Sequence, residues 1–278
     1  MLETRNIDKE CLSVTVRSIE EVLSETLSED SFKYVLEYLE EGEAQLLKPL
    51  SVDISYINKG NPDFDIAHQY LDLVLNGKRN DATKLILDSV EEGFSIKKIF
   101  LNVFQPVQRE IGRLWQTNKI SVAQEHYCTA VTQMIVSQLY PYIFQEEKNG
   151  YILVATCIGG ELHELGVRMV ADFFEMNNWD TYYLGANTPI QSIIETIINR
   201  KANLLAISAT MSKHISEVTK LIQQIRQTEV KDIKIIVGGY PFNLIAKLWK
   251  EVGADGFARD ALNAVKIGEE LVGVVNTL

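Results

Sequence analysis

The sequence predicts an α-helical region followed by an α/β domain built on a five-stranded parallel sheet. Two observations predict this fold class. Through the first half of the chain, apolar residues recur at the three- and four-residue spacing of amphipathic helices. From residue 148 onward, short apolar runs alternate with amphipathic stretches, which is typical of strands joined by helical crossovers. We therefore expect three segments, residues 1–60, 61–147 and 148–278.

Residues 1–60 are predicted to form an acidic helical segment. Their apolar residues have helical spacing in VRSIEEVLSETL and FKYVLEYLEEGEAQLL. The segment carries 13 Asp or Glu against 6 Lys or Arg, in a chain whose net charge is -11. A field of this sign repels a phosphate backbone, so we do not expect the segment to bind DNA.

Residues 61–147 are predicted to form a four-helix bundle. The short connections GKRN and TNKI make neighbouring helices antiparallel. Ser121 and Gln124 form a capping box that marks the start of the last helix. Pro106 is expected to kink the third helix without ending it. The four predicted helices span residues 64–76, 80–92, 95–116 and 121–145.

The third segment is predicted to contain five short buried strands. Parallel strands with right-handed crossovers bury both faces of their sheet under helices. This pattern is flavodoxin-like, or Rossmann-like, and such sheets bind ligands beyond the carboxyl ends of their strands. The predicted strands span residues 151–157, 180–186, 203–210, 233–239 and 255–258.

The composition of the chain predicts its cellular location and the state of its cysteines. No apolar run reaches the roughly 18 residues of a membrane span, and the first residues lack the features of a signal peptide, so we expect a cytoplasmic protein. The three cysteines, at positions 11, 128 and 157, are far apart. Their spacing argues against a disulfide framework and against a zinc site.

The segment Glu161-Leu162-His163-Glu164-Leu165-Gly166 is the most informative motif. It leaves the first predicted strand at its carboxyl end, where a preceding glycine pair lets the backbone turn tightly. A histidine on such a loop is presented outward, as a metal ligand must be. Glu161 can hydrogen-bond one imidazole nitrogen of His163 and leave the other free, which fixes the tautomer and raises the basicity of the ligand.

This loop resembles the acid-x-His-x-x-Gly loop of cobalamin-binding domains. Two further elements of that family have counterparts here, Ser208-Ala209-Thr210 at the end of the third strand and Gly238-Gly239 after the fourth. The resemblance implies that His163 replaces the dimethylbenzimidazole tail as the lower ligand of cobalt. It also implies that the glycines leave room for the displaced tail and that the serine hydrogen-bonds it.

A second constellation, Trp115-x9-Glu125-His126, spans the end of the third helix and the start of the fourth. Taken alone, it is compatible with a core tryptophan and a solvated Glu-His pair. Beside a cobalamin domain it resembles CarH-type photoreceptors. That resemblance implies that Trp115 and Glu125 shield the adenosyl group of adenosylcobalamin, and that His126 becomes the upper cobalt ligand after light.

The leading functional hypothesis is therefore a non-enzymatic light or adenosylcobalamin sensor. CarH-type proteins begin with a DNA-reading module, and the acidic residues 1–60 show no such unit. We therefore expect the protein to act through a transcription factor or signalling protein, as AerR-like antirepressors do. Residues 1–60 could serve as a dimerisation arm, as a docking site for a transcription factor or kinase, or as a cap on the bundle. Direct DNA binding and membrane association are not expected, and homo-oligomerisation is left open. Adenosylcobalamin is the expected cofactor, with methylcobalamin and hydroxocobalamin as alternatives.

Two other functional classes are considered. The alternative is a corrinoid methyl-carrier protein of a methyltransferase system, which shares the bundle-plus-cobalamin-domain plan. A mutase subunit is disfavoured, because the chain has no room for a large substrate-holding barrel. Among the remaining histidines, His68 is expected at the surface or in an interface. His214 is expected to be solvated at the start of a helix, and its alternative is an approach to the cofactor tail.

Overall fold

The computed structural model describes residues 5–8, 10–46, 55–144 and 147–274 of the 278-residue chain. The chain divides into two compact units, residues 1–135 and 136–278, with the boundary inside a helix. Residues 47–54 of the predicted N-terminal segment, and residue 145 at the end of the predicted fourth bundle helix, lie outside the described residues.

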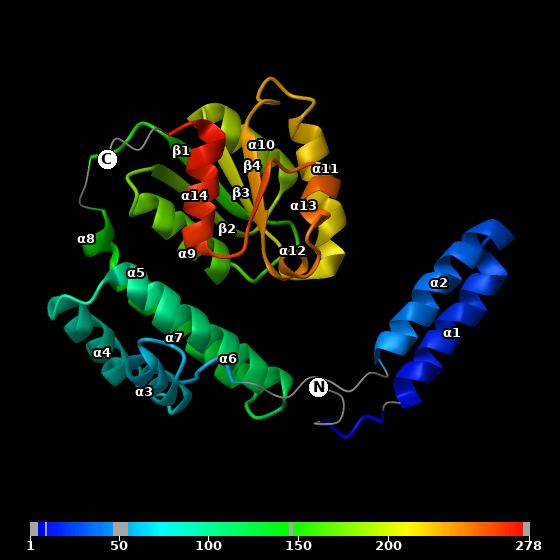
Figure 1. Ribbon diagram of the computed structural model, residues 1–278, viewed down its shortest axis with the longest axis horizontal. Helices are drawn as coiled ribbons and strands as arrows, with labels where there is room; N and C mark the ends of the chain where they lie inside the picture. Colours follow the sequence, from blue (N-terminus) through cyan, green and yellow to red (C-terminus); the bar gives the residue numbers. More distant parts are fainter. Residues whose placement is uncertain (1–4, 9, 47–54, 145–146, 275–278) are drawn as a thin grey trace. The chain divides into compact units, whose positions relative to one another are not determined.

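Helices α1 (Glu10–Thr26) and α2 (Glu29–Leu46) lie side by side as a helical hairpin (Figure 1). A two-residue connection joins them, and the chain re-enters a helix where the backbone N–H of Phe32 donates to the carbonyl of Ser28 at 2.8 Å. The helical nature predicted for this part of the sequence is confirmed for residues 10–46.

Four successive helical stretches follow within residues 55–138. Apolar side chains from these stretches form the core, in which Tyr70, Phe100 and Phe104 are fully buried. The hydroxyl of Tyr70 forms a 2.9 Å hydrogen bond with that of Thr132, so the polar end of a core aromatic residue is satisfied. The stretches are α3 (Phe64–Leu75), α4 (Arg79–Glu91), α5 (Ile96–Lys98) continued by the π-helix η2 (Ile99–Phe104) and α6 (Gln105–Gln116), and α7 (Val122–Gln138).

Pro106 is accommodated by a π-helical turn, which the sequence did not predict. A proline inside a helix has no N–H to donate and its ring crowds the carbonyl four residues earlier. Widening the preceding turn relieves that crowding. The carbonyl in question belongs to Asn102, and it accepts a hydrogen bond from Nδ2 of Asn61 at 2.7 Å. The helix therefore continues past the proline with this carbonyl satisfied.

The capping box at the start of α7 is confirmed. The backbone N–H of Gln124 donates to Oγ of Ser121 at 3.2 Å, and Oε1 of Gln124 accepts from the backbone N–H of Ser121 at 3.0 Å. These reciprocal bonds satisfy two amides that have no partner within the helix. The helix ends earlier than predicted, at Gln138, and a short helix α8 (Tyr140–Ile143) with Pro141 in its first turn follows.

All five predicted strands form, and each begins and ends within two residues of its predicted limits. They are β1 (Ile152–Ile158), β2 (Asp180–Thr188), β3 (Leu204–Ser208), β4 (Lys234–Gly238) and β5 (Gly256–Ala258). Every pairing is parallel, and the strand order is β2-β1-β3-β4-β5. This is the doubly wound, flavodoxin-like order in which a switch point falls beside β1.

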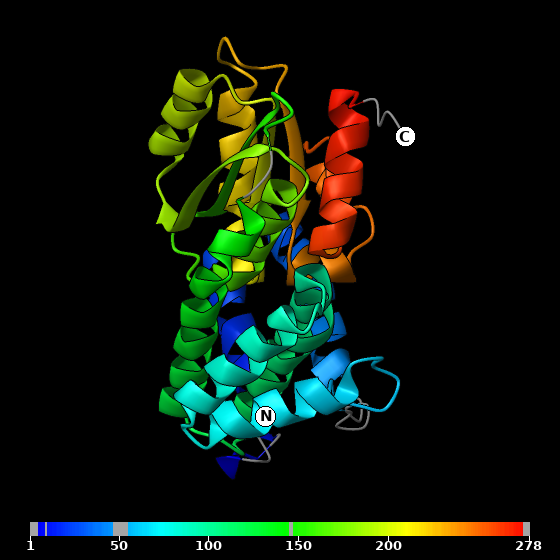
Figure 2. The same ribbon diagram turned by 90° about the vertical axis from the view of Figure 1, so that its left-hand side faces the viewer.

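Helices cover both faces of this sheet (Figure 2). Helix α14 (Ala261–Val272), drawn in red, lies on one side of the strands, and α10 (Ile190–Arg200) and α11 (Ile215–Ile225) lie on the other. Helix α9 (Leu165–Glu175) packs with α14. Alternate residues of each strand face opposite helix layers; in β3, for example, Leu205 and Ile207 join the core beneath α10 and α11. Three short helical segments follow β3 and β4, namely η3 (Ser212–His214), α12 (Tyr240–Leu244) and α13 (Leu248–Glu251).

Candidate functional site

The loop between β1 and α9 is held in place by the end of β2. Gly160 has a φ of +82°, a conformation that favours glycine. Its backbone N–H donates to Oδ1 of Asn187 at 2.7 Å, and the N–H of Asn187 donates to the carbonyl of Glu161 at 3.0 Å. These two bonds fix the loop at the carboxyl edge of the sheet, where ligands of such folds bind.

Glu161 is fully buried and its carboxylate lies at the centre of the loop. Oε1 accepts hydrogen bonds from the backbone N–H and from Nδ1 of His163, at 3.0 and 2.5 Å. Oε2 accepts from the backbone N–H groups of Thr210 and Met211, at 2.7 and 3.2 Å. Burial acts to raise the pKa of this carboxyl, but the hydrogen bonds outweigh it and lower the pKa to about 2. Glu161 is therefore a carboxylate at neutral pH.

His163 combines an anchored Nδ1 with an exposed ring. Its side chain is 60% exposed, although its Nδ1 partner Glu161 is entirely buried. The contact with the carboxylate places the proton on Nδ1 and leaves the lone pair of Nε2 for a metal. The thiol of Cys157 contacts the carbonyl of His163 at 3.6 Å, which adds a second restraint on the same residue. The predicted Glu161–His163 pair is confirmed as a contact.

His214 is the residue of this site that the sequence analysis missed. It was expected to be solvated, but it is 6% exposed, and its Nδ1 lies 2.9 Å from Oε2 of Glu161. The buried carboxylate thus lies between two imidazoles, one exposed and one buried. The correction has a physical reason: the helical turn η3 that carries His214 follows β3, and the carboxyl ends of β3 and β1 are adjacent.

The two other predicted elements of the loop site also lie at this edge. Ser208 ends β3 and is half-buried, between Cys157 of β1 and Gly238 of β4 in the strand register. Gly239 has a φ of +106°, and a Cβ built on it would lie 2.1 Å from the carbonyl oxygen of Ala209. Gly239 is therefore required by the close approach of two backbone segments, whatever its role toward a ligand.

Gly166 in the first turn of α9 is exposed, and a Cβ built on it would meet nothing within 4 Å. The surface beside it is therefore open. An exposed imidazole on a glycine-bordered loop, with its second nitrogen fixed on a buried carboxylate, fits a bulky ligand that carries a metal.

The second constellation lies in the helical unit. Trp115 is half-buried near the end of α6. Glu125 in the first turn of α7 accepts a 3.0 Å hydrogen bond from Oγ1 of Thr129 and pairs with Nδ1 of its neighbour His126. The side chain of His126 is 74% exposed. The side chains of Glu125 and His126 are thus paired in the structure. The roles predicted for these two residues toward an adenosyl group rest on the resemblance alone.

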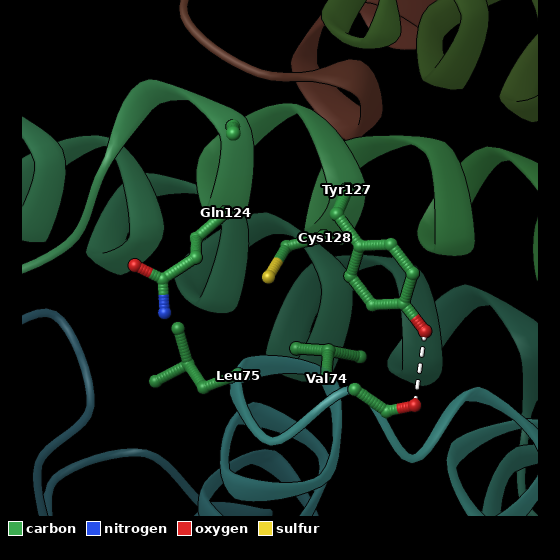
Figure 3. A pocket seen from close by; sticks show the side chains of 7 residues that line it. Val74, Leu75, Gln124, Tyr127 and Cys128 are labelled. Atoms are coloured by element: carbon green, nitrogen blue, oxygen red, sulfur yellow. Dashed lines mark hydrogen bonds between the residues drawn. The ribbon is translucent and has the colours of Figure 1, made fainter.

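A shallow apolar pocket of about 280 Å³ lies between the end of α3 and the start of α7. In Figure 3 the hydroxyl of Tyr127 points away from the pocket and donates to the carbonyl of Gly77, at 3.0 Å. This bond ties α7 to the loop after α3. The lining residues are Val74, Leu75, Gly77, Ala123, Gln124, Tyr127 and Cys128.

Comparison with known protein families identifies the class of ligand. Residues 151–266 match the family model described as B12 binding domain, and residues 66–140 match a second family model with the same description. Together the two matches take in more than half of the chain. Residues 151–266 are therefore a B12 binding domain, and the protein binds cobalamin.

Several corrinoid proteins are similar to this chain. Dimethylamine corrinoid protein 1 of Methanosarcina mazei is 22% identical over 70% of this chain and 90% of its own length. Dimethylamine corrinoid protein 2 of the same organism is 22% identical over 75% of this chain and 97% of its own length. The structure of Methanosarcina barkeri monomethylamine corrinoid protein matches with a TM-score of 0.66 at 21% identity, covering 74% of this chain and 98% of that one. This last match shows a shared fold.

These relatives correct two predictions. The light or adenosylcobalamin sensor is wrong, because the similar proteins are named as corrinoid proteins for methylamines and not as photoreceptors. The expected partner, a transcription factor or signalling protein, is wrong for the same reason. None of the helices in the described part of the chain combines the length and apolarity that a membrane span requires.

Proposed function

We propose that this protein is a corrinoid methyl carrier that works with a methyltransferase. The observation that carries the proposal is the exposed imidazole of His163, fixed by the buried carboxylate of Glu161 on a chain whose relatives are methylamine corrinoid proteins. The relatives named for dimethylamine align over most of their own length, so the likeness extends beyond the sheet domain.

In this function, the residues of the sheet domain hold and orient the cofactor. His163 would bind cobalt through Nε2, while Glu161 keeps the proton on Nδ1 and strengthens the ligand. When bound, the corrinoid supplies the cobalt atom that takes up and releases a methyl group. Ser208, Thr210, Gly166 and the pair Gly238-Gly239 would line the space for the rest of the cofactor. The chain itself then acts as a carrier and not as a catalyst.

We propose methylated amines as the first class of methyl donor to test, since the relatives carry these names. We expect activation of the amine to occur on another protein, because the relatives are named as corrinoid proteins and not as amine-binding enzymes. The partner is accordingly a separate methyltransferase that binds the amine.

The experiment is a transfer assay with the full chain, loaded with hydroxocobalamin and reduced. It is mixed with ¹⁴C-labelled mono-, di- or trimethylamine or methanol, each with a purified methyltransferase for that donor. Label is expected on the loaded protein with at least one donor. The label should be absent when the methyltransferase is left out, and absent from the loaded His163→Ala variant. The matched control His68→Ala, which replaces an exposed histidine of α3, should be labelled as wild type is. Absence of label with all four donors would contradict the proposal.

A further inference from the structure

The hairpin α1–α2 exposes apolar side chains that a folded protein usually buries. No residue of α1 is buried along Glu10–Thr26. Val22 is 58% exposed and Tyr34 is 65% exposed. Clustered exposed apolar groups of this kind mark interaction sites more often than isolated ones do. We define the hairpin surface as Val14, Ile19 and Val22 of α1 with Tyr34 and Tyr38 of α2.

The spacing of these residues makes stripes along each helix. Ile19 and Val22 are three residues apart, and Tyr34 and Tyr38 are four apart, so each pair lies one turn apart on the same side of its helix. The rings of Tyr34 and Tyr38 are in contact, with centroids 5.6 Å apart. Tyrosine offers a large apolar ring with a polar end and is enriched where proteins meet.

Acidic residues surround this surface. Residues 10–46 contain ten Asp or Glu and two Lys or Arg, a net charge of -8. This charge repels nucleic acid and anionic membranes. It also repels a second copy of the same hairpin, which would bring a further charge of -8 into contact. A partner that covers the apolar stripes must therefore bring positive charge of its own.

We propose that the hairpin surface docks a protein whose apolar groove is bordered by lysine and arginine side chains. The apolar stripes would provide the buried centre of the interface, and the acidic rim would steer and select the partner. The hairpin lies outside both family matches, which begin at residues 66 and 151. The docking proposal does not rest on the proposed function, because it uses no residue of the cobalamin site.

The test uses two labelled amphipathic peptides of about 18 residues, long enough to span about 27 Å as helices. One is built from Leu and Lys and the other from Leu and Glu. Binding to the full chain is measured by fluorescence anisotropy at low salt and at about 1 M salt, where the screening length is about 3 Å. The measurement is repeated with the triple variant Val22→Ser, Tyr34→Ser, Tyr38→Ser. The matched control is Leu262→Ser, which removes an exposed apolar side chain of α14.

The Lys peptide is expected to bind the wild type and the Leu262→Ser control equally. The affinity of the Lys peptide should be about tenfold lower for the triple variant than for wild type. For wild type it should also be lower at high salt than at low salt. The Glu peptide should not bind. Because the substituted side chains are exposed, circular dichroism should show an unchanged helix content. Equal binding of both peptides, or a Lys-peptide affinity unaffected by the triple variant, would overturn the proposal. So would sedimentation showing a wild-type dimer that the triple variant converts to a monomer, since the occupant would then be a second copy.

Discussion

The buried imidazole of His214 lies 2.9 Å from Oε2 of Glu161, the oxygen opposite to the one that holds His163. The two residues are 53 positions apart in the sequence and meet because they follow neighbouring parallel strands. His214 therefore helps to hold the carboxylate that orients the proposed cobalt ligand.

Replacing His214 by alanine should leave Oε2 of Glu161 with fewer donors in a buried position. A hydrogen bond to a charged group contributes about 1.5–3 kcal/mol, so we expect the free energy of unfolding at neutral pH to fall by about 2 kcal/mol. Denaturant unfolding of the corrinoid-free protein measures this. His68→Ala, at an exposed position, should change it by less than about 0.5 kcal/mol. Equal effects of the two substitutions would mean that the His214–Glu161 contact is not stabilising.

The pH dependence of stability should report the low pKa of Glu161. Burial raises that pKa, but hydrogen bonds lower it from 4.5 to about 2 in the folded protein. A carboxyl with a lowered folded pKa stabilises the fold above its unfolded pKa, and this contribution, about 3 kcal/mol, is lost as the pH falls from about 5 to about 2. In the same corrinoid-free protein, the difference in unfolding free energy between wild type and Glu161→Gln should shrink over that range. A difference that stays constant from pH 6 to about pH 2 would rule this out.

Asp172 on α9 should show the opposite pH dependence. Burial raises the pKa of its carboxyl to about 7, against the favourable charge of Arg168. A carboxyl with a raised folded pKa loses stability as the pH rises from about 4 to about 7, because the folded state must then bury a charge. The free energy of unfolding, measured with denaturant, should therefore be larger for Asp172→Asn than for wild type at about pH 8, by up to about 4 kcal/mol. At about pH 4 the variant should be no more stable than wild type. The exposed Asp232→Asn should show no such change; a wild type as stable as Asp172→Asn at both pH values would refute this assignment.

Gly239 should tolerate no side chain. Its φ is +106°, and a Cβ would lie 2.1 Å from the carbonyl oxygen of Ala209. We expect Gly239→Ala to cost about 3 kcal/mol or more, from strained backbone and steric overlap together. Gly150 is the matched control, since its φ is +84° but a Cβ there meets nothing within 4 Å; Gly150→Ala should cost about 1 kcal/mol. Thermal unfolding compares the two variants, and similar losses would show that the backbone contact with Ala209 is unimportant.

The local parts of the fold could be predicted from the sequence, because local patterns encode them. Apolar runs placed the five strands within two residues, and Ser121 with Gln124 placed the start of α7. The π-helical turn before Pro106 could not be predicted in this way. In that turn the carbonyl of Asn102 accepts a hydrogen bond from Asn61, which lies 41 residues earlier in the sequence.

In the site, too, contacts between residues close in sequence could be predicted and contacts between distant residues could not. Glu161 and His163 are two residues apart, so their contact followed from the motif. His214 was assigned to solvent because its partner is distant in sequence and only the sheet brings the two together. Trp115 lies near the end of α6 and Glu125 and His126 lie near the start of α7, but their spacing carried no information about what binds beside them. The sensor prediction failed at that step, where a helix-end pattern was taken to specify a ligand.

The central claim, that His163 ligates cobalt, is tested most directly by electron paramagnetic resonance of the cob(II)alamin-loaded protein. A nitrogen ligand on the axis splits the cobalt lines into triplets when it is ¹⁴N and into doublets when it is ¹⁵N. Protein grown with ¹⁵N-histidine and loaded with unlabelled cobalamin should give doublets, and the same labelled protein carrying His163→Ala should not. Triplets that persist in the ¹⁵N-histidine protein would show that the cofactor's own benzimidazole remains on cobalt, and the account of this site would be wrong.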